Sequence, residues 1–454
     1  MGTTYTQTNL STAISQLALR LSDPNNVFWS QAELTIYLQT ALRMYNSLTW
    51  FYRTDFSFTN SGATNVWNSL ALLSGSPRLR TVTDTQCYTE IEYMLLEPPS
   101  GGTWTGTSQF SISMLSQSLQ RRRDEILQVT NANQSLEAGI ALIPGTRRTF
   151  LADTVIDVSR VRYLPTGGSA VTLYRDDTVA QEYYESPLYQ QPPGTPNTFM
   201  LSAQPPLSFD VDIPPNQPGS YEAVILSQGT PFNPPSSTIL GIPDDFAWVA
   251  EWGALADILG QESEATDRQR SDYCRKRYQD GLGLIQQTPW IMLGAVNGVA
   301  VNVDSIFSAD RYSPGWDSSP TSFGPFIVVG GLDFFAAPTQ QATGMTVLGN
   351  MPVPSVGNDY LQIPPSDLDT IYDLAQARAC FKMGGGEWQQ ALELEQRAII
   401  ACAAENSRLK SMGSFSDILD QRGWAQDRDQ NRYNDASSSK YQETEYAKRV
   451  YRGG

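Results

Sequence analysis

Three helix-forming blocks, separated by long stretches rich in Pro, Gly, Ser and Thr, constrain the fold of this chain most. They span residues 8–46, 244–287 and 366–411. Helices this far apart in the sequence bury their apolar stripes only when the chain gathers them in space. The blocks therefore predict an α+β fold, in which one helical bundle is assembled from separated parts of the chain and carries strand-rich insertions.

Two of the blocks begin alike. Ile242-Pro243-Asp244-Asp245 opens one, and Ile363-Pro364-Pro365-Ser366-Asp367 opens the other. One interpretation is a structural repeat. The other is two unrelated helices that each start after proline with an Asp or Ser cap, and the sequence leaves both open. The pair Asp244 and Asp245 is expected to cap its helix, because a helix N-terminus favours carboxylates.

Apolar spacing gives the helices within each block. The first block is predicted to form two helices that are separated by Asp23-Pro24-Asn25-Asn26, the second of them capped by Ser30 with Glu33 three residues on. The second and third blocks are each predicted to form a helical hairpin, with breaks near Gly260 and at residues 384–386. A further helix is expected at 109–130.

The remaining segments alternate apolar and polar residues. Strands are predicted at Phe56–Thr59, Tyr88–Leu96, 154–174 and 199–226. The prolines between residues 192 and 218 predict edge strands and fixed turns. The expected organisation is a helical docking bundle (1–49, 244–289 and 366–412), a β-rich domain with one helix near 109–130 (50–243), a loop and β insertion (290–365) and an extended polar C-terminal arm (413–454).

Composition narrows the function. The net charge of −16 argues against a grip on nucleic-acid phosphates. The chain contains no histidine, which removes Ser/His/Asp and Cys/His catalysis and histidine zinc sites. We predict no catalytic residue, no cofactor and no metal site. Four cysteines without CxxC spacing are expected to be buried and reduced, as in a protein made in a cytosol, and neither a transmembrane segment nor a secretory signal is expected.

Two groups of residues are candidate interfaces. Arg121, Arg122 and Arg123 form either a contact for an anion or partner, or a solvated helix face paired with Asp124 and Glu125, and we favour the solvated face. The arm carries spaced aromatic residues in a polar, neutral segment, which is typical of an arm that orders on a neighbouring subunit or of a disordered terminus. These aromatic residues are Trp424, Tyr433, Tyr441, Tyr446 and Tyr451.

Several segments between residues 28 and 226 resemble virion structural proteins of tailed bacteriophages. The Pro-rich strand region in particular is similar to that of their head-to-tail adaptor proteins. The segments are Phe28–Leu34, Ala41–Trp50, Leu96–Pro99, Trp104–Thr107, Leu173–Asp177, Gly194–Phe199, Pro205–Leu207 and Pro214–Pro215. None of these motifs is a chemical signature.

The resemblance implies a connector: a ring, commonly of twelve subunits, that joins the portal to downstream tail proteins in the neck or tail of the virion. DNA would pass through the ring without specific binding during ejection, and no membrane would be involved. An acidic body suits such a conduit, since a negative lining lets duplex DNA slide without sticking.

Two alternatives remain. One is another tail or baseplate component of the same particle. The other, of a different class, is a carboxylate-based glycan hydrolase or a glycan-binding module. It is motivated by the abundance of aromatic and acidic side chains, and paired carboxyls such as Asp244 with Asp245 and Asp176 with Asp177 would supply its chemistry.

Overall fold

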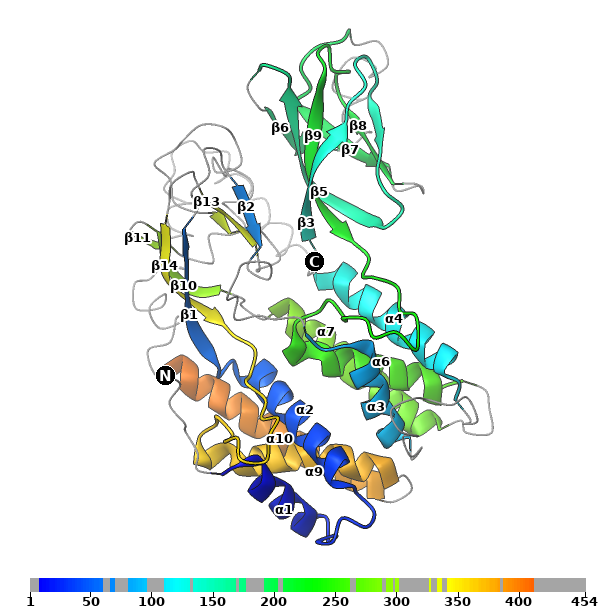
Figure 1. The fold of residues 1–454 in the computed structure, drawn as a ribbon, viewed down its shortest axis with the longest axis vertical. Helices are drawn as coiled ribbons and strands as arrows, with labels where there is room; N and C mark the ends of the chain where they lie inside the picture. Colours follow the sequence, from blue (N-terminus) through cyan, green and yellow to red (C-terminus); the bar gives the residue numbers. More distant parts are fainter. Residues whose placement is uncertain are drawn as a thin grey trace, which may run out of the picture.

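The computed structural model describes most of the chain up to residue 411. The described residues are 8–59, 66–69, 81–95, 110–130, 134–168, 171–176, 192–202, 207–261, 267–287, 291–296, 299–301, 326–327, 333–336, 341–383 and 387–411. They form an α+β protein of helices and antiparallel sheets with one parallel strand pair (Figure 1). The predicted arm, 413–454, lies outside the described residues.

Eight α-helices and two 3-10 turns are present in these residues. The helices are α1 (Leu10–Arg20), α2 (Gln31–Thr49), α3 (Asp84–Met94), α4 (Ile112–Thr130), α6 (Ala247–Leu259), α7 (Arg268–Gln287), α9 (Leu368–Met383) and α10 (Glu387–Ser411). The 3-10 turns are η2 (Asp244–Phe246) and η4 (Pro365–Asp367). Helices predicted from apolar spacing are therefore confirmed in all three blocks and at 109–130.

Fourteen strands are described. They are β1 (Arg53–Thr59), β2 (Val66–Ser69), β3 (Gln134–Ala141), β4 (Arg148–Phe150), β5 (Val155–Pro165), β6 (Val171–Arg175), β7 (Thr198–Ser202), β8 (Ser208–Val211), β9 (Gly219–Ser227), β10 (Ile291–Val296), β11 (Val299–Val301), β12 (Phe326–Ile327), β13 (Asp333–Ala336) and β14 (Gln341–Leu348). Strands were predicted at Phe56–Thr59, 154–174 and 199–226, and they are found there.

The strand predicted at Tyr88–Leu96 is wrong, because Tyr88–Met94 lies in helix α3; Leu96 is outside the described residues. Thr83 caps the helix in a capping box with Gln86. Cys87, Ile91 and Met94 then recur at helical spacing, and all three are fully buried. The helix brings its apolar face into the helical core, where propensity of individual residues for strands no longer decides the structure.

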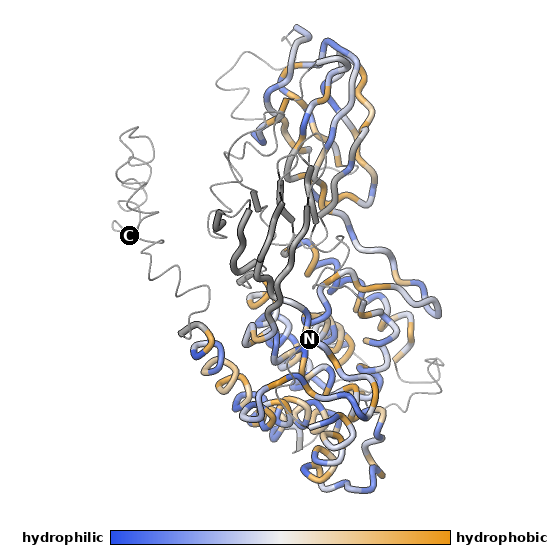
Figure 2. The backbone as a smooth tube through the Cα atoms, turned by 60° about the vertical axis from the view of Figure 1, so that its left-hand side comes forward, coloured by the Kyte–Doolittle hydropathy of each residue, from blue (hydrophilic) through white to orange (hydrophobic). Residues whose placement is uncertain are grey.

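Two apolar cores organise the molecule. The larger core gathers all eight helices, so α3 and α4 belong to the helical bundle and not to the β-rich domain predicted at 50–243. The smaller core consists of buried side chains from the β region, from Ile140 to Ile225 in the sequence. The helices alternate hydrophobic and hydrophilic segments along their length, as expected for amphipathic helices around one core (Figure 2).

The sheets also cross the predicted domain boundaries. Strand β1 pairs with β14, and β2 pairs with β13, so the segment after the first helical block forms sheets with the insertion predicted at 290–365. The compact β region is consequently 134–227, which forms one seven-stranded sheet in the order β3-β9-β5-β6-β7-β8-β4.

The chain folds as two equivalent units, one inserted into the other. The inner unit consists of α3, α4, β3 to β9, η2, α6 and α7, in that order. The outer unit has the same succession: α1, α2, β1, β2, then, after the whole inner unit, β10 to β14, η4, α9 and α10. Every element of one unit thus has a counterpart in the other.

Strand pairing follows the same correspondence. The outer unit forms the sheets β1-β14-β10-β11 and β12-β13-β2. Replacing each strand by its counterpart gives β3-β9-β5-β6 and β7-β8-β4, which together are the order of the inner sheet. In the inner unit the two halves are joined by the parallel pair β6 and β7. This agreement of chain order with pairing order identifies a duplicated topology.

The two units also share the same backbone contact before their first helix. The residue before the first helix forms an isolated antiparallel bridge with the segment before the Ile-Pro pair: Asn9 with Tyr360, and Thr83 with Ile239. The residue that follows each bridge, Leu361 or Leu240, donates its backbone N–H across it, to the carbonyl oxygen of Thr8 (3.1 Å) and of Val82 (2.9 Å). The repeat interpretation of the Ile-Pro openings is therefore the correct one.

Candidate functional site

The candidate site is the seam between the two units. Across it, helices α2, α9 and α10 of the outer unit meet α3, η2, α6 and α7 of the inner unit. The seam contains several buried charged side chains, and charges are buried only where they have partners or a function.

A buried guanidinium joins three helices at the centre of the seam. Arg378 of α9 is 2 % exposed and forms ion pairs with Glu90 of α3 and with Glu251 of α6, the latter at 3.2 Å. Thr40 of α2 donates its hydroxyl to Glu90 over 2.8 Å. The guanidinium also lies over the ring of Trp252, 5.2 Å from its centroid. One cation therefore faces two buried carboxyl groups.

The excess carboxyl is accommodated by protonation. Burial raises the pKa of Glu251 to about 8, and the neighbouring charge of Glu90 acts in the same direction, against the attraction of Arg378. Protonation of Glu251 lowers the negative charge that Arg378 has to compensate inside the protein.

Asp244 and Asp245 do not cap their own helix, so that prediction is wrong. The 3-10 turn that they begin has Pro243 at its N-cap and no side-chain cap bond. Asp244 instead accepts hydrogen bonds from the backbone N–H groups of Thr81 (2.7 Å) and Val82 (2.9 Å). Its carboxylate holds the segment that leads into α3 in place, because it accepts hydrogen bonds from backbone N–H groups of that distant segment.

Asp245 reaches in the other direction, across the seam. It accepts a hydrogen bond from the side chain of Asn46 (2.6 Å) and one from the backbone N–H of Met351 (3.1 Å). Asn46 also donates to the carbonyl oxygen of Gly349. Both carboxylates of the pair are therefore buried and engaged in holding backbone, which explains them without acid/base chemistry.

Aromatic rings fill the seam beside the charged cluster. Trp252 and Tyr273 of the inner unit pack against Phe381 of the outer unit, with ring centroids 5.2 and 6.0 Å apart. Arg270 lies over the Phe381 ring and donates to the Phe381 carbonyl oxygen, which is 2.9 Å away. Tyr273 further contacts Trp388 of α10. These contacts make the seam a tightly packed, permanent junction.

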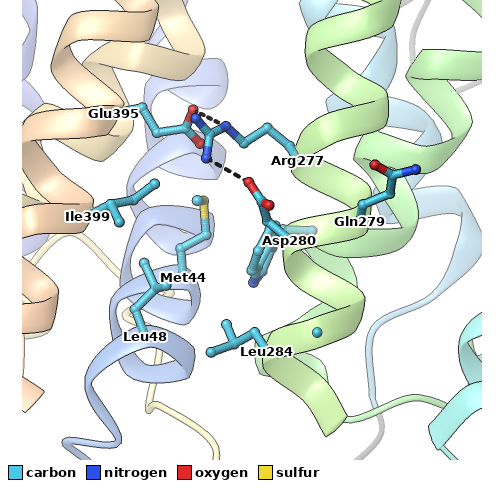
Figure 3. A pocket seen from close by; sticks show the side chains of 10 residues that line it. Met44, Leu48, Arg277, Gln279, Asp280, Leu284, Glu395 and Ile399 are labelled. Atoms are coloured by element: carbon cyan, nitrogen blue, oxygen red, sulfur yellow. Dashed lines mark hydrogen bonds and ion pairs between the residues drawn. The ribbon is translucent and has the colours of Figure 1, made fainter. Parts of the chain in front are cut away.

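A cavity of about 440 Å³ opens at one end of the seam, between α2 and α10 on one side and α6 and α7 on the other (Figure 3). Its apolar wall is formed by Met44, Leu48, Trp248, Leu284 and Ile399.

The polar end of this cavity is an ion-paired network. Arg277 lies between Glu395 (2.9 Å) and Asp280 (3.3 Å) (Figure 3). Tyr273 donates its hydroxyl to Glu395. Burial raises the pKa of Glu395 to about 8, whereas Arg277 and the Tyr273 hydroxyl favour its carboxylate form. The charged groups that line the cavity are thus already paired: Arg277 with Glu395 across the seam, and with Asp280 within α7.

The three arginines predicted as a candidate interface have different surroundings. Arg121 is exposed and pairs with Asp257 of α6. Arg122 pairs with Asp257 and Glu125 and lies over the ring of Tyr278. The predicted pairing of an arginine with Glu125 is confirmed for Arg122. Asp257 of α6 is a second partner, which Arg121 and Arg122 share.

Arg123 is buried, which contradicts a solvated face for all three. Its guanidinium pairs with Asp124 and donates to the carbonyl oxygen of Thr230 over 2.7 Å. It lies over the ring of Phe232, 4.3 Å from the centroid. Arg123 therefore fixes the connection that follows β9 onto helix α4.

Other predicted site residues are placed as follows. The five aromatic residues of the arm, Trp424, Tyr433, Tyr441, Tyr446 and Tyr451, and also Asp177, lie outside the described residues. All four cysteines are buried and free of disulfides, as expected for reduced thiols: Cys87, Cys274, Cys380 and Cys402.

Two searches of the described ranges found nothing. Within them no group of three or more Cys, Asp or Glu side chains is arranged to hold a metal ion. No helix in this part of the chain combines the length and apolar character that crossing a bilayer requires.

Sequence reasoning missed the central cluster. Glu90, Glu251 and Arg378 each lie within a helical segment that is otherwise apolar on the same side. A lone charged residue in such a stripe is a signal for a buried ion pair, since an unpaired charge is costly to bury. The partners could not be assigned, because they are up to 288 residues apart.

No protein-family model matches the chain, and no curated protein sequence matches it significantly.

Proposed function

We propose that this chain is a non-enzymatic virion structural protein, a head-to-tail adaptor whose ring joins the portal to the tail and forms part of the DNA conduit. The observation that carries the proposal is the pair of equivalent units. Both units extend their strands from the same side of the helical core (Figure 1). Two copies of one body in a common orientation are the geometry of neighbouring positions in a ring.

The use of the buried charge supports this proposal. The carboxyl groups that an acid/base mechanism would need are tied to backbone donors or to guanidinium groups within the protein, as described for Asp244, Asp245 and Glu251. Their task is to lock elements together. The net charge of −16 suits the wall of a channel for duplex DNA, because like charge keeps the polymer from adhering.

The test is co-purification of the full chain with the products of its neighbouring genes, followed by negative-stain imaging. We expect a ring that attaches to the end of a portal assembly. A protein that remains strictly monomeric beside a portal and cleaves polysaccharide would overturn the proposal in favour of the glycan hydrolase. A ring found at the baseplate would instead favour the other tail component.

A further inference from the structure

The seam uses different faces of the two units. The outer unit contributes its second helix, α2, while the inner unit contributes its first helix, α3. The counterparts of these helices, α4 and α1, are not among the helices that make the main contacts across the seam. The contact is therefore head-to-tail. The outer unit keeps its α1 face outside the seam, and the inner unit keeps its α4 face outside the seam.

Equivalent positions can be assigned because paired helices have equal lengths. Helices α2 and α4 both have 19 residues, and α1 and α3 both have 11. Aligned from their first residues, their core positions agree in burial: Leu34 and Leu38 of α2 correspond to Leu115 and Leu119 of α4, and all four are fully buried. Burial that disagrees between equivalent positions then marks the seam.

On α2, the seam residue Thr40 is 3 % exposed. Its equivalent on α4, Arg121, has a side chain that is 63 % exposed. Leu48, which packs partly buried against the core and lines the seam cavity, corresponds to Val129, which is 38 % exposed. At these two positions helix α4 is exposed where its counterpart α2 is buried or partly buried.

The first helices differ in the opposite sense. On α3, Glu90 is 3 % exposed and Tyr93 packs against the core. Their equivalents on α1 are Gln16, which is exposed, and Leu19, which is 64 % exposed. An apolar side chain is therefore left uncovered on each of the two unused faces, Val129 on α4 and Leu19 on α1.

We propose that the α4 face of the inner unit, which contains Arg121 and Val129, docks with the α1 face of the outer unit, which contains Gln16 and Leu19, in a second copy of this chain. The contact repeats the internal seam, so the succession of units continues from one molecule to the next. A head-to-tail contact of this kind closes into a ring or runs on as a filament.

The proposal also sets the stoichiometry of the ring, and only this step rests on the proposed function. Each chain supplies two ring positions. A ring with the twelve positions that adaptors commonly have therefore needs six chains, and six copies of 50.2 kDa have a mass of about 301 kDa. A ring with one position per chain would have twice that mass.

The experiment uses the full chain, two face variants and sedimentation velocity. Leu19→Asp places a charge on the α1 face, and Val129→Asp places one on the α4 face. Ile143→Asp is the matched control, because Ile143 is 67 % exposed and lies between β3 and β4 in the β region 134–227, not on α1 or α4. All three positions are exposed, so thermal midpoints close to that of the wild type are expected and are measured on the same samples.

We expect the wild type and the control to assemble, and each face variant alone to sediment as a 50.2 kDa monomer. An equimolar mixture of the two face variants should form a dimer, since each partner brings one intact face. Assembly of either variant like the wild type would overturn the proposal. So would a mixture that stays monomeric, or a wild type that stays monomeric at the highest attainable concentration.

The outcomes separate this inference from the proposed function. Assembly that depends on Leu19 and Val129, without attachment to a portal, leaves the docking intact and removes the adaptor role. If the monomeric face variants attach to a portal in the same number of copies as the wild type, the adaptor role stands and the docking between copies is overturned.

Discussion

The buried cation of the seam gives the sharpest prediction. Replacing Arg378 by Met keeps most of the side-chain volume but removes the charge that faces Glu90 and Glu251. At neutral pH Glu251 is already largely protonated, so the loss falls on the one remaining carboxylate. Removing one partner of a buried ion pair leaves an uncompensated buried charge, which typically costs about 3–5 kcal/mol.

The same reasoning fixes the pH dependence of the effect. A stranded carboxylate relieves the cost by taking up a proton, which is easier at lower pH, so Arg378→Met should lower the free energy of unfolding by about 4 kcal/mol at pH 7 and by less at pH 5. Urea denaturation at both pH values, followed by tryptophan fluorescence, measures this. Trp252 reports on the site directly, because its ring lies beneath the guanidinium.

Two further variants make the test decisive. Adding Glu90→Gln to Arg378→Met removes the stranded carboxylate and should restore most of the lost stability. Arg148→Met is the control, because Arg148 is 54 % exposed in its pair with Asp210 and should change stability by about 1 kcal/mol or less. The reasoning is refuted if Arg378→Met costs less than about 1 kcal/mol at pH 7, or costs the same at pH 5.

Four other outcomes are expected. Burial raises the pKa of both Glu251 and Glu395 to about 8, so between pH 5 and 8 the folded protein binds more protons than the unfolded chain, and stability should fall as the pH rises, by up to about 1.4 kcal/mol per pH unit for each group; Glu251→Gln should remove its share of this slope in thermal unfolding and leave the share of Glu395. The four buried cysteines should react with a thiol reagent only after denaturation, and labelling of the native protein would contradict their burial. Gly281→Ala should cost about 1–3 kcal/mol, because its Cβ would lie 2.7 Å from Val249, whereas Gly283→Ala on the same helix meets open space and should be neutral or stabilising in urea denaturation. Deletion of 413–454 should leave the thermal midpoint unchanged and reduce the yield of assemblies, and an unchanged yield would exclude a role for the arm.

Local patterns in the sequence were sufficient for most of the helices. Leu34 and Leu38 recur at helical spacing, and Ser30 caps their helix, as the sequence predicts. Glu33 serves this helix end and a neighbouring helix at once. Burial raises the pKa of its carboxyl, against the opposing effects of Lys382 of α9, 3.0 Å away, and of a hydrogen bond with the backbone of Ser30.

The duplication lay at the limit of what the sequence reveals. The core positions of the two units remain apolar, but the seam positions differ in kind: Thr40 against Arg121 and Glu90 against Gln16. Equivalent positions of the two units thus differ in burial. The type of residue at a position depends more on its burial than on its place in the topology. Only the Ile-Pro openings, which set the entry into each helical hairpin, stayed recognisable.

The nesting of the units has a consequence for synthesis of the protein. Strand β1 leaves the ribosome long before β14, its partner, and the entire inner unit is made between them. The inner unit has all its own partners at hand and is free to fold first, as domains generally do during translation. The segment of about 220 residues between β2 and β10 is then a folded domain and not a flexible loop. Bringing β1 to β14 therefore costs much less conformational entropy than closing a flexible loop of that length would. Chains truncated after residue 290 and released from the ribosome should therefore already contain one protease-resistant unit, while α1, α2, β1 and β2 lack the later strands and helices that they pack against.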